Sequence, residues 1–192
     1  MTGAADIGAL MTNPIIHPFR LEQKRELDLG SASVIVAAIN EQFAFLIENW
    51  GLAKLLWRDR VNPHHERVAQ MIYFAVADSY CKANNLDITP EADTGTGAVD
   101  FKFSHGYDSR ILVEIKLSTN SNAVNGYEKQ LNTYAKSERT MRATYILIDV
   151  GSMGNKDQKL VKISNENKAA RIPTPELIFI DGSLKASASK RR

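Results

Sequence analysis

The stretch "GAVDFKFSHGYDSRILVEIKLSTN", from Gly97 to Asn120, decides the fold of this chain. It contains two β-prone runs, Val99 to Phe103 and Ile111 to Leu117, with the turn residues "SHGYDS" between them. Successive side chains of a strand point to opposite faces of the sheet, so Glu114 and Lys116 share one face. The stretch therefore predicts a β-hairpin with charged side chains on one of its faces.

The turn determines which residues of the hairpin lie opposite each other. If it is centred on Tyr107, the numbers of paired residues sum to 214, and Asp100 lies opposite Glu114. Opposed side chains have Cβ atoms about 5 Å apart, so two like charges there destabilise the sheet unless a cation lies between them. Mg²⁺ suits this position because it takes oxygen ligands and commonly uses one or two carboxylates. The alternative is a structural hairpin whose polar face meets water, with Lys102 and Lys116 neutralising the acids.

The rest of the chain predicts an α/β fold with a central mixed β-sheet flanked by helices. Further strands are expected over Leu86–Glu91, Thr144–Val150 and Leu177–Ile180, beside Ala98–Ser104 and Arg110–Leu117 of the hairpin. Helices are expected over Ser31–Asn49, Leu52–Trp57, Pro63 to about Lys82, and within "NGYEKQLNTYAKSE". The stretch after Val150 is expected to be irregular until the last strand. The early strands then form a meander, and the later ones are joined by a helical crossover.

Two of these helices have predicted caps, and one has a predicted apolar side. Asn62 is expected to cap the helix that starts at Pro63, since the missing N–H of proline costs nothing at the first helical position. Its apolar side is expected to carry Val68, Ile72, Ala75 and Val76. Asn125 is the expected cap of the later helix.

Composition and charge narrow the class of protein. With 44% hydrophobic and 24% charged residues, the 192-residue chain is expected to form one globular domain. We divide it into a helical extension over residues 1–58, whose first 13 residues are frayed, a core over 59–182 and a basic disordered tail over 183–192. The tail is either simply solvated or a phosphate-binding arm. A net charge of +2 does not by itself indicate a nucleic-acid partner.

Three features of the sequence indicate where in the cell the protein is located and how it could assemble with other chains. The single cysteine, Cys81, excludes an intramolecular disulfide, and no Cys/His cluster has zinc spacing, so a reducing cytoplasm is the simplest location. The first thirty residues lack the pattern of a signal peptide. Asn40, Glu41 and Gln42 interrupt the apolar window from Val34 to Trp50, which favours a buried or partner-facing helix over a membrane span. This helix is a candidate surface for a homodimer or a larger complex.

Three groups of residues follow one another in a recognisable order. Asp100 lies in "GAVDF", Glu114-Ile115-Lys116 follows, and Gln130 and Tyr134 come later within an expected helix. This order resembles the PD-(D/E)xK nuclease superfamily, including the Q-x-x-x-Y element of its RecB-like branch. Val99 stands where the family name has proline. The resemblance covers about residues 62–150.

The resemblance implies a restriction-endonuclease-like αβββαβ core with an N-terminal helical addition, and a nuclease that uses Mg²⁺, with Mn²⁺ as a substitute. It implies that Asp100, Glu114 and the Ile115 carbonyl bind the metal. Lys116 would position or help to deprotonate the attacking water and stabilise the charge of the transition state. The expected substrate is nucleic acid, more specifically DNA. A module of the same fold without catalysis, serving nucleic-acid binding or assembly, is the alternative function.

The resemblance also points to Glu66 as the acid that completes the catalytic and metal site. The alternative is that an acid in the first turn of a helix is favoured by the helix dipole alone. His64 and His65 are alternative ligands, or exposed histidines at a helix start. Gln130 is expected to reach the substrate or the edge of the metal site, although Tyr134 on the same helix face could be core.

Overall fold

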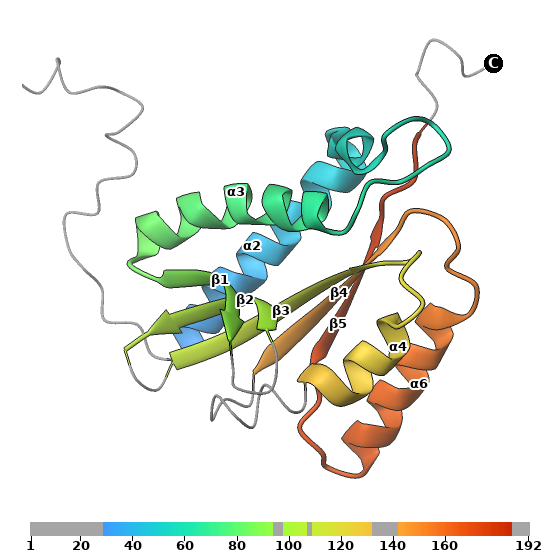
Figure 1. Cartoon of the computed structure of the whole chain (residues 1–192). Helices are drawn as coiled ribbons and strands as arrows, with labels where there is room; N and C mark the ends of the chain where they lie inside the picture. The colour runs from blue at the N-terminus through green and yellow to red at the C-terminus, as the bar shows by residue number, and fades with distance from the viewer. Residues whose placement is uncertain (1–28, 94–97, 107–108, 132–141, 186–192) are drawn as a thin grey trace, which may run out of the picture.

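The computed structural model describes residues 29–93, 98–106, 109–131 and 142–185 (Figure 1). Five strands form one sheet in the order β1-β2-β3-β4-β5. They are β1 (Asp87–Asp93), β2 (Ala98–His105), β3 (Ser109–Leu117), β4 (Ala143–Asp149) and β5 (Glu176–Asp181). β1, β2 and β3 pair antiparallel, whereas β3, β4 and β5 pair parallel. The expected mixed sheet is therefore confirmed, with its early meander.

Helices cover both faces of this sheet, as expected (Figure 1). α2 (Leu29–Asn49) and α3 (Arg67–Asn84) lie on one face, and the short helix η2 (Leu52–Leu56) follows α2. α4 (Ala123–Asn125), continued by the π-helical η3 (Gly126–Leu131), and α6 (Lys156–Ala169) lie on the other face. The predicted frayed start over residues 1–13, the turn centre at Tyr107, Tyr134 and residues 186–192 of the tail lie outside the described residues.

The β2–β3 pair has the register that the sequence predicts. Phe101 pairs with Val113 and Phe103 with Ile111, so the numbers of paired residues sum to 214. The pairing ends at Phe101, one step before Asp100 would face Glu114. The two acids therefore lie at the point where the backbone ladder between these strands stops.

Tyr73 of α3 ties both helices of one layer to the sheet. Its buried ring lies 5.1 Å from that of Phe43 in α2 and 4.9 Å from that of Phe101 in β2. Its hydroxyl donates a 2.7 Å hydrogen bond to Oδ1 of Asn40, which is also buried. Because Asn40 belongs to α2, this contact fixes α3 against α2 as well as against the sheet.

The structure corrects three expectations about α3. The helix begins at Arg67, four residues after the predicted start, because Pro63 instead forms an antiparallel bridge with Trp57. Asn62 therefore does not cap it. The expected apolar side, with Val68 and Ile72 among its members, is only partly buried, and Ala75 is exposed. The fully buried line is shifted by one residue and consists of Ala69, Tyr73, Ala77 and Cys81.

Two expectations about the other layer are wrong. The stretch after Val150 was expected to be irregular, but it contains the helix α6. α6 is strongly polar and buries only Leu160 and Ser164, so its sequence lacks a clear apolar stripe. Asn125 ends α4 instead of capping it, and Asn122 precedes the first helical residue.

α2 combines an apolar sequence with a buried face. By length and composition alone, residues 31–49 could cross a membrane. The polar residues from Asn40 to Gln42 therefore do not break the apolar segment as was expected from the sequence. In the fold, Val36, Ile39, Phe43 and Ile47 of α2 pack in the same core as β2, β3 and β4. Its opposite side leaves Val34 and Phe45 exposed.

Removing the Tyr73 hydroxyl tests how α3 is held. We expect Tyr73→Phe to lower the free energy of unfolding by roughly 1–3 kcal/mol, because the buried Asn40 carbonyl loses its hydrogen-bond donor. The measurement is urea unfolding followed by circular dichroism. The double variant Tyr73→Phe/Asn40→Leu removes both partners and should recover part of the loss. Equal stability of Tyr73→Phe and the unchanged chain would contradict this role.

Candidate active site

Asp100 and Glu114 hold together the ends of β2 and β3 where the backbone ladder stops. The Asp100 N–H donates to Glu114 Oε2 at 3.2 Å, and the Ile115 N–H donates to Asp100 Oδ2 at 2.7 Å. Where the pairing of β2 and β3 ends, two carboxylates thus accept hydrogen bonds from backbone N–H groups. The side chains of Asp100 and Glu114 are only 12% and 4% exposed.

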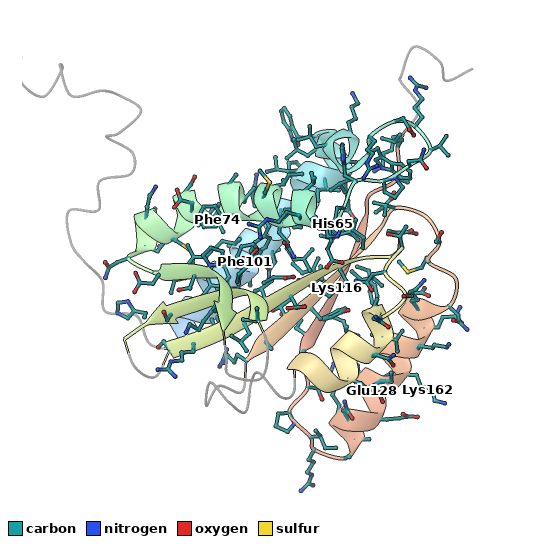
Figure 2. All side chains as sticks on the ribbon, viewed as in Figure 1. His65, Phe74, Phe101, Lys116, Glu128 and Lys162 are labelled. Carbon is teal, nitrogen blue, oxygen red and sulfur yellow. The ribbon has the colours of Figure 1, made fainter. Side chains whose placement is uncertain are left out.

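Lys116, which is labelled in Figure 2, lies among three carboxylates. Its Nζ is 2.7 Å from Glu114 Oε1, 3.0 Å from Glu66 Oε1 and 3.8 Å from Asp100 Oδ2. It also donates to the Ile115 carbonyl at 3.3 Å, so this oxygen faces the same centre. All four side chains are at most 15% exposed. The structure therefore brings together the three acids, the lysine and the main-chain oxygen named from the sequence.

Glu66 directs its carboxylate to the end of β3. It immediately precedes α3, yet its side chain makes no capping hydrogen bond. Its Oε2 instead accepts the Leu117 N–H at 3.1 Å and Asn120 Nδ2 at 3.2 Å, while Oε1 binds Lys116. The helix dipole alone would not account for this set of partners.

Two further side chains of the site were not assigned a role from the sequence. Gln70 Nε2 donates to Asp100 Oδ1 at 2.8 Å, and Asn120 donates to Glu66. Gln70 follows Glu66 by four residues, so their shared helix face was a usable signal. Asn120 follows β3 in a turn, where spacing gives no direction for a side chain.

The other candidates are placed less directly. Gln130 lies in η3, but its side chain is outside the described residues, as is all of Tyr134. His64 and His65 line a neighbouring pocket that also includes Glu66. Leu112, which precedes Glu114 on the same strand face, is buried with Ala123 of α4. Helices therefore cover this face.

The charges of the site influence one another strongly. Burial, followed by repulsion from Glu114, raises the pKa of Asp100 to about 7 despite the nearby lysine. Burial would lower the pKa of Lys116, but Glu114, Asp100 and Glu66 outweigh it and raise this pKa. Burial also raises the pKa of Tyr145, and the three carboxylates add to this shift. The site therefore has an excess of negative charge around one retained ammonium group.

The donor atoms of the site suit a hard divalent cation. Three carboxylates and a main-chain carbonyl offer only oxygen, which Mg²⁺ and Mn²⁺ prefer. Among the residues that the structure describes, no three His, Cys, Asp or Glu side chains form a ready cluster of metal ligands. Instead, the carboxylate oxygens are turned towards Lys116. The residues fit such a cation by their chemistry and by their excess negative charge.

Comparison with known families places the chain. A family model, described as a domain of unknown function (DUF8371), matches residues 32–152, which is more than half of the chain. The chain belongs to the DUF8371 family. No curated protein and no solved structure matches it. The DUF8371 region includes α2 from residue 32 onward and every charged residue of the candidate site, from Glu66 to Lys116, and it ends before α6 and β5.

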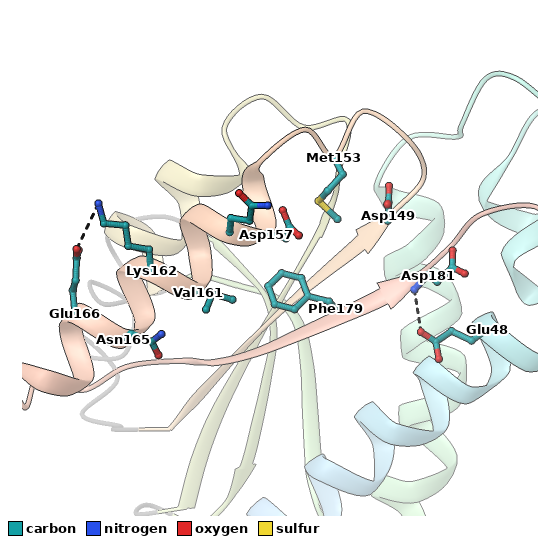
Figure 3. A pocket seen from close by; sticks show the side chains of 11 residues that line it. Glu48, Asp149, Met153, Asp157, Val161, Lys162, Asn165, Glu166, Phe179 and Asp181 are labelled. Atoms are coloured by element: carbon teal, nitrogen blue, oxygen red, sulfur yellow. Dashed lines mark hydrogen bonds and ion pairs between the residues drawn. The ribbon is translucent and has the colours of Figure 1, made fainter.

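A larger pocket of this DUF8371 protein lies elsewhere, between α6 and β5 (Figure 3). It has a volume of about 940 Å³ and is lined by Phe179 and Val161 together with several acids, among them Asp157 and Asp181. Glu48 at its rim accepts the Asp181 N–H at 3.0 Å. This pocket lacks the lysine-centred group of acids, so the site at the end of β2 and β3 remains the better candidate.

The raised pKa of Asp100 gives the DUF8371 protein a specific pH dependence of stability. The neutral carboxyl stabilises the fold fully below the unfolded pKa of 3.8, and this contribution is lost as pH rises through the folded pKa of about 7. Asparagine stays neutral and keeps one oxygen for the Ile115 N–H. With a chelator present, we therefore expect Asp100→Asn to be roughly 1–3 kcal/mol more stable than the unchanged chain at pH 8, with a smaller difference at pH 5.

Urea unfolding at the two pH values measures this difference. Asp181→Asn is the matched control, because hydrogen bonds from Ser183 lower the pKa of Asp181, and it is exposed. Removal of the Asp181 charge should give no gain at pH 8. A gain for Asp100→Asn that is the same at pH 5 and pH 8 would show that its charge is not disfavoured in the fold.

Proposed function

We propose that this protein is a Mg²⁺-dependent nuclease of the PD-(D/E)xK type that hydrolyses phosphodiester bonds in DNA, on a restriction-endonuclease-like core. One observation carries the proposal: the Lys116 ammonium lies within 3.8 Å of carboxylates from α3's start, β2 and β3. A hairpin that only met water would leave its charges exposed, but these are largely buried. Burying three acids around one lysine is costly for a purely structural role.

Asp100, Glu114, Glu66 and the Ile115 carbonyl are the groups that would hold the cation. When bound, Mg²⁺ supplies a Lewis acid that polarises a phosphate oxygen and favours deprotonation of water. Gln70 holds the Asp100 carboxylate through its amide, and Asn120 holds that of Glu66. These two residues orient the acids, so that less reorganisation is needed when a cation binds.

Lys116 supplies positive charge where the reaction develops negative charge. In hydrolysis, the oxygen of water forms a bond to phosphorus, the bond to the leaving strand breaks, and that strand's oxygen takes up a proton. The phosphate gains negative charge on the way, and a buried ammonium stabilises it more strongly than it could in water. Because the surrounding acids raise the pKa of Lys116, we assign it charge stabilisation and positioning of water in its protonated form.

Cleavage assays on a panel of substrates test the proposal. The panel contains circular, linear and single-stranded DNA and RNA, each with Mg²⁺, with Mn²⁺ and with a chelator. We expect metal-dependent cleavage of DNA that Lys116→Ala reduces by roughly 10²–10³-fold. Lys82→Ala is the matched control, because Lys82 is an exposed lysine of α3 that pairs with Asp78 away from the site. It should cleave like the unchanged chain.

Metal titration separates the nuclease from a binding module of the same fold. Mn²⁺ binding, measured by calorimetry, should fall at least tenfold in Asp100→Asn/Glu114→Gln, since both substitutions remove a charged ligand. If folded protein leaves every substrate intact and binds no Mn²⁺ through these acids, the catalytic proposal is wrong. The alternative of a non-catalytic nucleic-acid-binding or assembly subunit would then take its place.

A further inference from the structure

A second pocket, of about 390 Å³, adjoins the candidate active site. Its walls come from the segment between η2 and α3 and from the residues that follow β3. The residues that line it are Arg58, Pro63, His64, His65, Glu66, Leu117, Thr119 and Asn120. Glu66 belongs to both the pocket and the lysine-centred site, so a ligand in the pocket would lie directly beside that site.

The loop that carries the pocket's basic residues is held by its own backbone. Trp57 and Pro63 form an antiparallel bridge, the Arg58 N–H donates to the Asn62 carbonyl at 2.9 Å, and the His64 N–H donates to the Leu56 carbonyl at 2.7 Å. Trp57 Nε1 also donates to the Gly182 carbonyl at 2.9 Å, which ties the loop to the chain after β5. The backbone under Arg58 and His64 is therefore positioned before any ligand arrives.

The lining of the pocket suits an anion. Arg58 carries a permanent positive charge and a fork of N–H donors that matches phosphate geometry. Nδ1 of His65 accepts the Arg67 N–H at 3.3 Å, so its Nε2 is left to carry the ring proton and to donate. Thr119 adds a hydroxyl. The one acid of the lining, Glu66, already binds Lys116, Leu117 and Asn120 with its two oxygens.

We propose that this pocket binds a phosphate group of the substrate strand, next to the phosphodiester bond that is cleaved; the inference rests on the proposed nuclease function. Its volume lies within the range of pockets that hold small ligands, and it is large enough for a phosphate with an adjoining sugar. A phosphate anchored here fixes the strand relative to Lys116, which aligns the reacting bond. Arg58 and His65 are then substrate-positioning residues, outside the group that holds the cation.

Binding and cleavage by matched arginine variants test this role. Arg58→Ala removes a pocket residue, whereas Arg60→Ala removes an equal charge from the same loop, where Arg60 is exposed and does not line the pocket. Binding of labelled single- and double-stranded oligonucleotides is measured by fluorescence anisotropy with a chelator present, over a series of salt concentrations. Thermal unfolding of each variant establishes that it is folded. His65→Gln supplies a second pocket variant, which should weaken binding in the same direction as Arg58→Ala.

We expect Arg58→Ala to weaken binding at least fivefold and to reduce the slope of log K against log salt by about 1, as loss of one phosphate contact requires. In cleavage assays it should raise KM more than it lowers kcat. Arg60→Ala should change binding less than twofold. Oligonucleotides with and without a 5′-terminal phosphate separate the two sources: an effect confined to phosphorylated ends assigns the pocket to a terminal phosphate, and an equal effect on both assigns it to an internal one.

The outcomes separate this inference from the proposed function. If the unchanged chain cleaves DNA and Arg58→Ala behaves like Arg60→Ala in binding and in KM, the pocket inference fails alone. If no substrate is cleaved but Arg58→Ala still lowers the salt slope, phosphate binding in the pocket stands and the nuclease proposal fails. Absence of nucleic-acid binding by the folded, unchanged chain, with Mg²⁺ as well as with a chelator, overturns the pocket inference directly.

Discussion

The site depends on the exchange of hydrogen bonds between β2 and β3 at the place where their backbone pairing ends. The carboxylate of Asp100 accepts the N–H of Ile115, and that of Glu114 accepts the N–H of Asp100. Two acids in these positions let the strands separate without leaving buried N–H groups unpaired, which would cost about 1–3 kcal/mol each. The same exchange places two nearly buried carboxylates side by side, so a cation is needed to offset their repulsion. Lys116 supplies the first positive charge because it follows Glu114 by two residues on the same strand face.

The third acid depends on packing far from the charges. Glu66 immediately precedes the first residue of α3. Its side chain reaches Lys116 only because α3 is held against the sheet. Tyr73 holds this helix by contacts with Phe43 and Phe101 and by its bond to Asn40. α2 therefore takes part in positioning the site, although it contributes no charge to it. This agrees with the extent of the DUF8371 match, which begins within α2 at residue 32.

Strands and their register could be predicted because alternation along a strand is a strong, local signal. The pairing of Phe101 with Val113 follows from the spacing around a short turn alone. Helices were harder to predict where tertiary packing overrides the local pattern. Small residues such as Ala69 and Ala77 let α3 approach the sheet closely, so the buried line is not the most apolar one. α6 has too few apolar residues to be recognised, and the bridge between Trp57 and Pro63 delays α3 through a contact that spacing cannot reveal. The roles of Gln70 and Asn120 likewise depend on side-chain directions that only the folded chain defines.

Local charge balance matters more for this protein than its net charge of +2. Three acids around one lysine leave the candidate site negative, and a negative site repels a phosphate backbone. A divalent cation removes the repulsion at the centre, but it acts over a short range at physiological ionic strength. Binding a polyanion therefore also needs positive charge beside the centre, on surfaces that the strand crosses. Arg58 lies in such a place, in a pocket that shares Glu66 with the site. The near-neutral total thus conceals a negative site and, beside it, a pocket that carries the positive charge of Arg58, and the two share Glu66.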